Sequence, residues 1–190
     1  MNKIEDIEQF AKDNYIPIAR KKTVQFMIDI ISKNNYKSFL EIGTAIGYTT
    51  IVLKQKFEYL KIVTIEKNQK RISLALDNFN DFNLLDKLSF LQEDALNYQL
   101  DDKFDLIFID AAKKKNKFFL EKFKNNLNAN GTIIIDNMNL DDLWTNAKPK
   151  KKDYYDKINQ ELISYLSTNN EYEVTFHYDI GDGIAVIKLK

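Results

Sequence analysis

The chain has 190 residues, with 28 basic and 28 acidic side chains, no cysteine and one histidine, His177. This length is sufficient for one domain with a sizeable core. The lack of cysteine excludes disulfides, thiolate metal sites and a thiol nucleophile, and one histidine excludes zinc or catalytic sites that need two. Because the formal net charge is zero, a site for a polyanion would have to be a local patch.

The amino-terminal stretch is charged and lacks the apolar core of a signal peptide. No run approaches the roughly 20 apolar residues of a membrane span, so we expect a cytoplasmic protein without a membrane partner. Apolar residues at helical spacing predict amphipathic helices over residues 3–13 and 20–33. Pro17 predicts a break between them, because proline lacks a backbone donor and favours extended geometry before it.

From Ser38 onward, short apolar runs alternate with amphipathic stretches. The apolar runs predict strands at residues 38–42, 61–65, 88–91, 104–109 and 131–135, with helices between most of them. This alternation favours a parallel sheet covered on both faces. Two further alternating runs, Tyr172–Tyr178 and Ile184–Leu189, flank a glycine-containing turn and predict an antiparallel hairpin at the sheet edge. His177 lies in the first of these runs and is interpreted as a sheet-face residue.

The first predicted strand ends at Glu41-Ile-Gly43, and Gly47 precedes a stretch from Tyr48 that can continue as a helix. A strand, a glycine turn and a helix start in this order form a cradle for a nucleotide-like ligand. The Gly-x-x-x-Gly spacing departs from the dinucleotide fingerprint. It better suits a ligand with a ribose, a cationic amino-acid tail and no pyrophosphate, such as S-adenosylmethionine. Plain strand–helix turns also show this spacing.

The second and third predicted strands also end in acidic residues. Glu66 lies about twenty residues beyond the glycine turn, where a carboxylate can bind both ribose hydroxyls. The alternative is a strand-end carboxylate that faces solvent. Asp94 and Ala95 follow the third strand and could contact adenine through a side chain and the backbone.

Carboxylates end the next two strands as well, at Asp110 and at Asp136-Asn137. In a doubly wound sheet, the first, fourth and fifth strands would bring these residues and the glycine turn to one edge. Two carboxylates and an amide oxygen form a hard donor set that suits Mg²⁺. For each aspartate alone, a helix N-cap is the competing interpretation.

Basic residues cluster at Arg20–Lys22, Lys113–Lys115 and Lys148–Lys152. All three clusters would surround the same edge of the sheet, where they could contact a polyanion. Solvated surface is the alternative for each of them. Trp144 could stack on a base or fill core.

Four motifs carry a resemblance to a known family: Glu41-Ile-Gly-Thr-Ala-Ile-Gly-Tyr-Thr49, Phe108-Ile-Asp-Ala-Ala-Lys113, Asp136-Asn137 and Gly181-Asp-Gly183. In this order and spacing, they resemble the metal-dependent O-methyltransferases of the caffeoyl-CoA and catechol type. Within that family, the chain looks most similar to the bacterial tRNA 5-hydroxyuridine methyltransferases. The resemblance implies a class I methyltransferase fold, S-adenosylmethionine, Mg²⁺ and a homodimer. We therefore expect an α/β protein with a mostly parallel seven-stranded sheet and a carboxyl-terminal antiparallel hairpin. Residues 1–190 would form a single domain, in which 1–35 are amino-terminal helices and a lid and 36–190 are a Rossmann-like core.

The resemblance also implies roles for individual residues. Those expected at the cofactor are Ile18 in the lid, Glu41, Gly43, Thr44 and Gly47 along the amino-acid tail, Tyr48 and Thr49 at the helix start, Glu66 at the ribose, Asp94 and Ala95 at the adenine, and Asp110 beside the methionine portion. Asp110, Asp136 and Asn137 would hold the metal, and Lys113 would lie near the nucleophile as a catalytic residue with Asp110. Two features depart from the family pattern. Ala112 replaces a common aspartate, and the segment after Asn137 differs from the usual substrate loop.

The expected reaction is methylation of 5-hydroxyuridine at the wobble position of the tRNA anticodon loop. A hydroxyl beside a carbonyl can chelate Mg²⁺, and a single-stranded base is already accessible. The expected tRNA-binding residues are Arg20, Lys21, Lys22, Lys114, Lys115, Lys148, Lys150, Lys151 and Lys152. One alternative is a small-molecule catechol or caffeoyl-CoA-like O-methyltransferase. Another is a non-catalytic module that binds S-adenosylmethionine or RNA.

Overall fold

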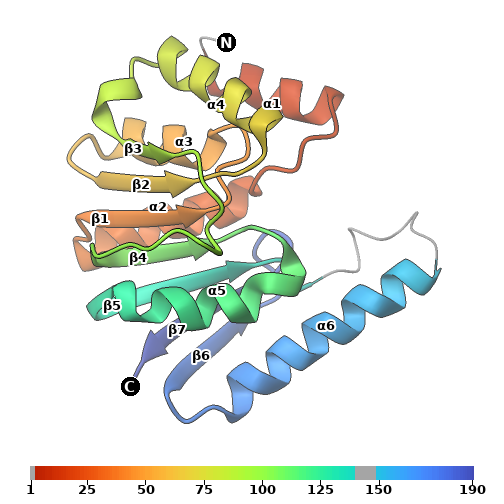
Figure 1. Ribbon diagram of the computed structural model, residues 1–190. Helices are drawn as coiled ribbons and strands as arrows, with labels where there is room; N and C mark the ends of the chain where they lie inside the picture. The colour runs from red at the N-terminus through yellow and green to blue at the C-terminus, as the bar shows by residue number, and fades with distance from the viewer. Residues whose placement is uncertain (1–2, 140–148) are drawn as a thin grey trace.

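The computed structural model describes residues 3–139 and 149–190. One seven-stranded sheet has the strand order β3-β2-β1-β4-β5-β7-β6 (Figure 1). The strands are β1 Ser38–Ile42, β2 Lys61–Ile65, β3 Ser89–Leu91, β4 Phe104–Ile109, β5 Leu127–Asp136, β6 Tyr172–His177 and β7 Ile184–Leu189. Strands β1 to β5 pair in parallel, whereas β7 is antiparallel to both β5 and β6. The predicted class I methyltransferase fold with its terminal hairpin is confirmed.

Helices cover both faces of this sheet. They are α1 Ile4–Asp13, α2 Lys21–Asn34, α3 Tyr48–Lys56, α4 Gln69–Asp81, α5 Asn116–Phe123 and α6 Pro149–Thr168. Short 3₁₀ turns are η1 Leu85–Lys87, η2 Lys113–Lys115 and η3 Lys124–Asn126. Helices α1 to α4 pack into one hydrophobic cluster, and α5 and α6 pack into the other (Figure 1). Among the described residues, no helix combines the length and the apolar character needed to cross a membrane.

Strand β4 shows why the interior strands are continuous apolar runs. It lies between β1 and β5, and five of its six residues are buried. Asp105 is the exception, and its carboxylate accepts hydrogen bonds from the backbone N–H groups of Lys37 at 2.7 Å and Ser38 at 3.0 Å. A strand that is buried between two layers of helices lacks the alternation of polar and apolar residues that a half-exposed strand shows.

Strand β5 is longer than its apolar run indicates. The pattern predicts a strand from residue 131, whereas the structure pairs Leu127 with Phe104 and shifts register before Leu106 pairs with Thr132. The intervening Asn130 has a φ of 65°. The first half of the strand contains polar residues at this irregularity, so the hydrophobicity pattern does not predict it as a strand.

Because β1, β4 and β5 are neighbours, their carboxyl ends meet at one edge of the sheet (Figure 1). The glycine turn, Asp110 and Asp136 follow or end these strands, as expected from the sequence. The turn between β6 and β7 reaches the same edge, where the Met138 N–H donates to the carbonyl oxygen of Gly183 at 2.9 Å. His177 ends β6 and packs against the ring of Phe26, with 5.2 Å between ring centroids, which agrees with a sheet-face role.

Candidate active site

Two glycines shape the loop between β1 and α3. Gly43 has a φ of 103°, and a Cβ atom there would lie 2.3 Å from the carbonyl oxygen of Asp110. Gly47 has a φ of 86° and precedes α3, and a Cβ atom there would lie 2.6 Å from the ring of Phe79. Both positions combine left-handed geometry with close packing, so the loop requires glycine at each.

The side chains that flank this loop are directed into the protein. Glu41 is 1% exposed, and its carboxylate accepts hydrogen bonds from the hydroxyls of Thr50 at 2.7 Å and Thr64 at 2.6 Å. Burial raises the pKa of Glu41 to about 7, although these hydroxyls oppose the shift. The hydroxyl of Thr44 lies 2.6 Å from that of Thr64, and Thr49 is buried as well. The carboxylate of Glu41 therefore joins β1 to α3 and β2.

Glu66 follows β2 and connects the glycine loop to α4. Its carboxylate accepts hydrogen bonds from the backbone N–H groups of Ala45 at 3.0 Å, Lys67 at 3.0 Å and Asn68 at 2.9 Å. A carboxylate offers about four acceptor positions, so one remains for a further donor.

Asp94 lies at the end of the neighbouring β3. It accepts a hydrogen bond from the Leu96 N–H at 3.0 Å and pairs with the Lys67 ammonium at 3.0 Å. The Leu96 N–H in particular lowers the pKa of Asp94. Ala95 is buried beside it. Glu66 and Asp94 are thus linked through Lys67 at adjacent strand ends.

A cavity of about 700 Å³ opens at the carboxyl edge of β4 and β5. Its lining residues are Glu8, Ala11, Lys12, Tyr15, Ile16, Pro17, Ile18, Ala19, Arg20, Lys21, Tyr48, Asp110, Lys113, Asp136, Asn137 and Asp182. A neighbouring cavity of about 330 Å³ shares Asp110, Lys113 and Asn137 and adds Arg71, Lys114 and Tyr155. The fold thereby brings the predicted metal and catalytic residues together with Ile18 and Tyr48. The remaining predicted cofactor residues (Glu41, Gly43, Thr44, Gly47, Thr49, Glu66, Asp94 and Ala95) do not line either cavity.

Asp110 and Asp136 are buried carboxylates that affect one another. Burial raises the pKa of Asp110 to about 6, against the opposing charge of Lys113. Burial and then the charge of Asp110 raise the pKa of Asp136 well above its ordinary value. The Oδ1 atom of Asp136 is buried and has no hydrogen-bond partner in the described part of the chain. Such a pair is costly to ionise without a nearby cation.

Lys113 and Asn137 complete this group. The Lys113 ammonium donates a hydrogen bond to the Oδ1 atom of Asn137, which places a cation against the amide oxygen. Burial lowers the pKa of Lys113, whereas the charges of Asp110 and Asp136 oppose this shift. Within residues 3–139 and 149–190, no three His, Cys, Asp or Glu side chains are arranged to hold a metal. The third candidate ligand here is an amide, and the oxygen-only set with an unpartnered carboxylate atom fits a hard divalent cation.

Ion pairs hold the segment between α1 and α2 over the cavity. The Arg20 Nε atom donates to both carboxylate oxygens of Asp182, at 3.0 and 2.9 Å. The Lys21 ammonium lies 2.6 Å from a carboxylate oxygen of Glu8, and this carboxylate raises the pKa of Lys21. Glu8 also accepts a hydrogen bond from the Tyr48 hydroxyl at 2.8 Å. Two predicted tRNA contacts, Arg20 and Lys21, are therefore paired with acidic residues here.

The remaining predicted tRNA-binding residues are Lys22, Lys114, Lys115 and those of the Lys148–Lys152 cluster, of which the structure describes only a part. Lys114 and Lys115 line a groove of about 440 Å³ beside the cavities. Its lining residues are Lys113, Lys114, Lys115, Lys117, Tyr154, Ile158, Glu161 and Leu162. Lys22 and Lys150 are exposed, and Lys152 is half-buried. Lys148 and Trp144 lie outside the described residues, as does the side chain of Lys151.

Asp182 and Arg71 lie near the carboxylates but were not among the predicted site residues. Asp182 lines the larger cavity and opposes the ionisation of Asp110 and Asp136, whereas Arg71 favours the ionised form of Asp110. The Gly181-Asp-Gly183 motif was a usable signal for Asp182. The lone arginine in α4 carried no comparable signal.

The sequence pattern of the O-methyltransferase family matches residues 4–190. The chain belongs to this family. Tapetum-specific methyltransferase 1 of Arabidopsis thaliana is 26% identical over an alignment 188 residues long, and the match covers 91% of this chain and 77% of that protein. The fold of this family member is similar to the crystal structure of a candidate caffeoyl-CoA O-methyltransferase from Staphylococcus aureus. In that comparison, the TM-score is 0.88 and the identity 29%, over 100% of this chain and 93% of the other. A Bacillus cereus O-methyltransferase in complex with SAH shares the fold, with a TM-score of 0.77 and 23% identity over 98% of this chain and 90% of the other.

Proposed function

We propose that the protein transfers the methyl group of S-adenosylmethionine to a hydroxyl of a small aromatic molecule of the catechol or caffeoyl-CoA type, with Mg²⁺ at the site. Membership of the O-methyltransferase family and the similarity to the S. aureus protein support this substrate class. The proposal that Mg²⁺ binds here rests on the buried Oδ1 atom of Asp136, which has no hydrogen-bond partner among the described residues. Asp136 lines the same cavity as Asp110 and Asn137.

The cofactor would lie along the carboxyl ends of β1 and β2. Since the side chains of Glu41 and Thr44 are buried, the backbone of the glycine loop is the part that can meet the amino-acid tail. Glu66 has an acceptor position for a ribose hydroxyl. Asp94 and Ala95 would contact the adenine. The SAH complex of the B. cereus structure supports this class of cofactor.

Asp110, Asp136 and Asn137 would hold Mg²⁺ through oxygen atoms. Bound Mg²⁺ favours the ionised form of a substrate hydroxyl and so supplies a nucleophile near neutral pH. Lys113 is positioned beside these ligands, and burial lowers its pKa. Its Nζ atom can therefore take the hydroxyl proton or stabilise the oxyanion. In the transfer, the sulfonium–methyl bond breaks as the oxygen–methyl bond forms, which leaves S-adenosylhomocysteine.

A second candidate substrate is 5-hydroxyuridine at the tRNA wobble position. The observation that favours it is the groove lined by Lys113–Lys115 and Lys117, in which Glu161 is the single acidic lining residue among those that the structure describes. Tyr154 lines the same groove and is 53% exposed, so a base could stack on its ring. Lysines in such a groove would contact phosphates and make binding sensitive to salt.

The test is methyl transfer from labelled S-adenosylmethionine with Mg²⁺, offered either catechol or tRNA that lacks the modification. We expect label in the methylated catechol, and Asp136→Asn should lower the transfer by about 100-fold or more because the negative charge of a ligand is lost. In metal-free buffer, the same variant should unfold at a higher temperature, since it removes the charge repulsion between the buried carboxyl groups of Asp110 and Asp136. Asp86→Asn, at an exposed position, is the matched control.

The two substrates lead to different results. Label in 5-methoxyuridine after nucleoside digestion, without catechol methylation, would replace the first candidate by the second. Undiminished transfer by Asp136→Asn would contradict the metal site with either substrate.

A further inference from the structure

The segment that follows β5 is held from two sides. On one side, the Met138 N–H donates to the carbonyl oxygen of Gly183 at 2.9 Å, and the Asn139 N–H donates to that of Asp182 at 2.8 Å. On the other side, the side-chain amide of Asn159, in α6, donates to the carbonyl oxygen of Met138 at 2.7 Å. Both polar groups of the Met138 backbone are therefore bonded to distant parts of the chain.

Asn137 depends on this support because its backbone is left-handed, with a φ of 66°. Residues with a side chain adopt this region at a cost, and it persists where neighbouring contacts define it. The bonds to Met138 orient the backbone that leaves Asn137 and so direct where its side chain points. Met138 itself is only 2% exposed, which further restricts the segment.

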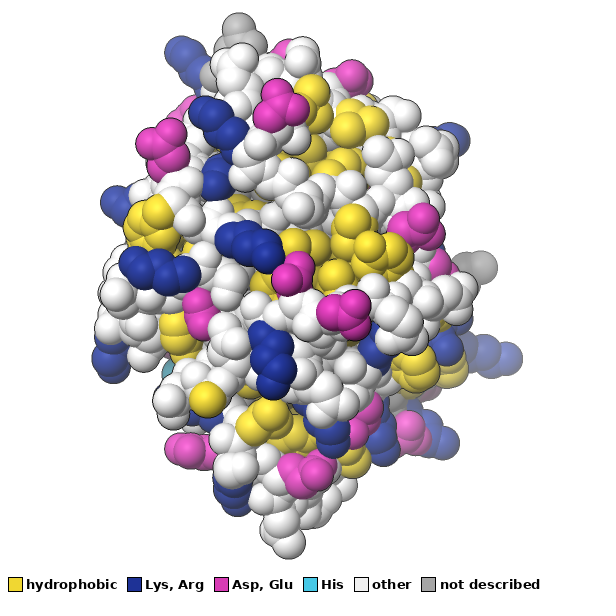
Figure 2. All heavy atoms as spheres, turned by 60° about the vertical axis from the view of Figure 1, so that its left-hand side comes forward, with side chains coloured by type: hydrophobic (Ala, Val, Ile, Leu, Met, Phe, Trp, Pro, Cys, Tyr) yellow, Lys and Arg dark blue, Asp and Glu magenta, His cyan; other side chains and the backbone are white. Residues whose placement is uncertain are grey.

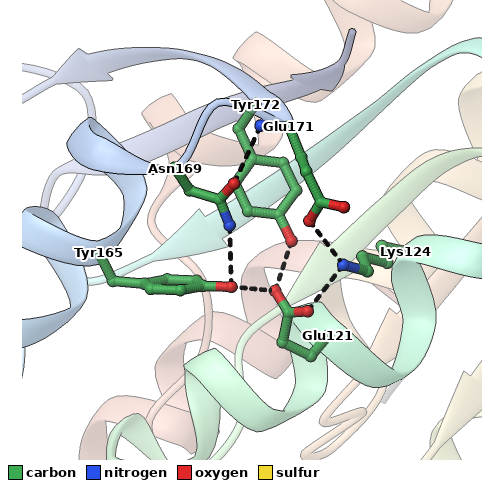
Figure 3. Close-up of polar contacts among 6 residues, drawn as sticks. All are labelled: Glu121, Lys124, Tyr165, Asn169, Glu171 and Tyr172. Atoms are coloured by element: carbon green, nitrogen blue, oxygen red, sulfur yellow. Dashed lines mark hydrogen bonds and ion pairs between the residues drawn. The ribbon is translucent and has the colours of Figure 1, made fainter.

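Asn159 lies close to Asn137, whose backbone it would support. It lines a narrow cavity together with Asn137, Lys113 and Asn116. Helix α6 is also fixed at its far end, where the hydroxyl of Tyr165 donates to Glu121 of α5, which also accepts a hydrogen bond from Tyr172 at the start of β6 (Figure 3). The hydrogen bond of Asn159 can therefore be removed while the other attachment of α6 remains.

We propose that Asn159 is a positioning residue for the metal site: its amide holds the Asn137–Met138 backbone so that the Asn137 Oδ1 atom stays beside Asp110 and Asp136. This inference rests on the proposed metal-dependent function. Groups that orient a metal ligand commonly change metal affinity by about 10–100-fold when they are removed. The role of Asn159 is thus distinct from fastening α6, which Tyr165 and Glu121 also do.

The experiment measures the affinity of the full chain for Mn²⁺ by electron paramagnetic resonance and its thermal unfolding without metal. Asn159→Ala should raise the Mn²⁺ dissociation constant about tenfold. Asn159→Asp keeps the shape of the side chain but lacks the amide donor, so it should weaken Mn²⁺ binding similarly. This variant replaces the alanine variant in the experiment if the latter does not fold. Tyr165→Phe is the matched control, because it removes the 2.6 Å hydrogen bond to Glu121 from the same helix. It should leave the Mn²⁺ affinity within about twofold while lowering the unfolding temperature by an amount similar to Asn159→Ala.

Equal Mn²⁺ affinity in the wild type, Asn159→Ala and Asn159→Asp would overturn the inference and reduce Asn159 to a structural contact. Equal weakening by Tyr165→Phe would also overturn it, because any loosening of α6 would then suffice. A wild-type protein that binds no Mn²⁺ would overturn the metal proposal first and this inference with it. The wild-type titration therefore separates the two failures.

Discussion

Glu41 couples the stability of the protein to pH through a single buried carboxylate. Its pKa in the folded protein is about 7, above the ordinary value of 4.5, chiefly because the group is buried. Between these two values, the folded protein holds a proton that the unfolded chain has already lost. Its contribution to the free energy of unfolding therefore decreases as the pH rises through this window.

Replacing Glu41 by glutamine should remove that pH dependence. The amide oxygen can still accept hydrogen bonds from Thr50 and Thr64, and the variant carries no charge to bury. Relative to the wild type, its free energy of unfolding should increase by about 2 kcal/mol as the pH rises from about 5 to about 8. Urea unfolding at a series of pH values measures this difference. A difference that does not vary with pH would show that Glu41 titrates normally in the folded protein.

At the scale of elements, the glycine loop sets how closely β1 approaches the end of β4. Gly43→Ala would bring a Cβ atom to 2.3 Å from the carbonyl oxygen of Asp110, which is backbone and cannot rotate away. We expect a loss of about 2–4 kcal/mol in the free energy of unfolding, together with weaker binding of S-adenosylhomocysteine. Denaturant unfolding and calorimetric titration measure the two effects.

Ala45→Gly provides the control within the same loop. Ala45 also has a positive φ, 49°, which glycine adopts without strain. This variant should stay within about 0.5 kcal/mol of the wild type. If Gly43→Ala were equally mild, the close approach of β1 and β4 would not constrain the loop.

The pair between Arg20 and Asp182 connects the segment before α2 to the turn between β6 and β7. The Arg20 side chain is 55% exposed, so its loss should cost less than about 1 kcal/mol of global stability. Locally, Arg20→Ala should increase amide hydrogen exchange over residues 16–19, because these residues lose their tie across the cavity.

Lys21→Ala is the matched comparison, since it breaks the neighbouring pair with Glu8 and leaves the turn untouched. Exchange over residues 16–19 should rise less in this variant than in Arg20→Ala. Unchanged exchange in both variants would mean that neither pair restrains the segment. The predicted role of Ile18 as a lid residue would then depend on apolar contacts alone.

For the whole molecule, the 28 basic and 28 acidic side chains balance, so a site for a charged substrate depends on how these side chains are distributed over the surface. Figure 2 shows the face at the amino ends of the parallel strands, where basic and acidic side chains are interspersed. That face offers no large area of one sign. The lysine-lined groove instead lies beside the active-site cavities at the opposite edge and is the candidate position for the phosphate of a substrate that carries one.

The homodimer that the family resemblance implies remains a prediction. Light scattering should give a mass of twice the 22.3 kDa of the chain. Because association follows mass action, dilution should shift the protein toward the monomer. A monomer at every concentration tested would contradict the prediction.

Several features of the site could be predicted because they are local in the sequence. The positions of Asp110 and Asp136 follow from apolar runs that end in a carboxylate, and the glycine turn from Gly43 and Gly47. The direction of Glu41 could not be predicted in this way. The direction of the Glu41 side chain is set by the alternation of side chains along β1 and by the hydrogen bonds from Thr50 and Thr64. Its carboxylate is therefore not part of the cavity lining.

Local patterns were therefore sufficient for the α/β class, the order of strands and helices, the terminal hairpin and the strand ends that carry the chemistry. Apolar periodicity, glycines and strand-end carboxylates act over a few residues, so the chain shows them directly. Packing between distant segments was needed to place Arg20 on Asp182 and Asn159 on Met138. Such contacts join residues far apart in the chain, and no local pattern marks them.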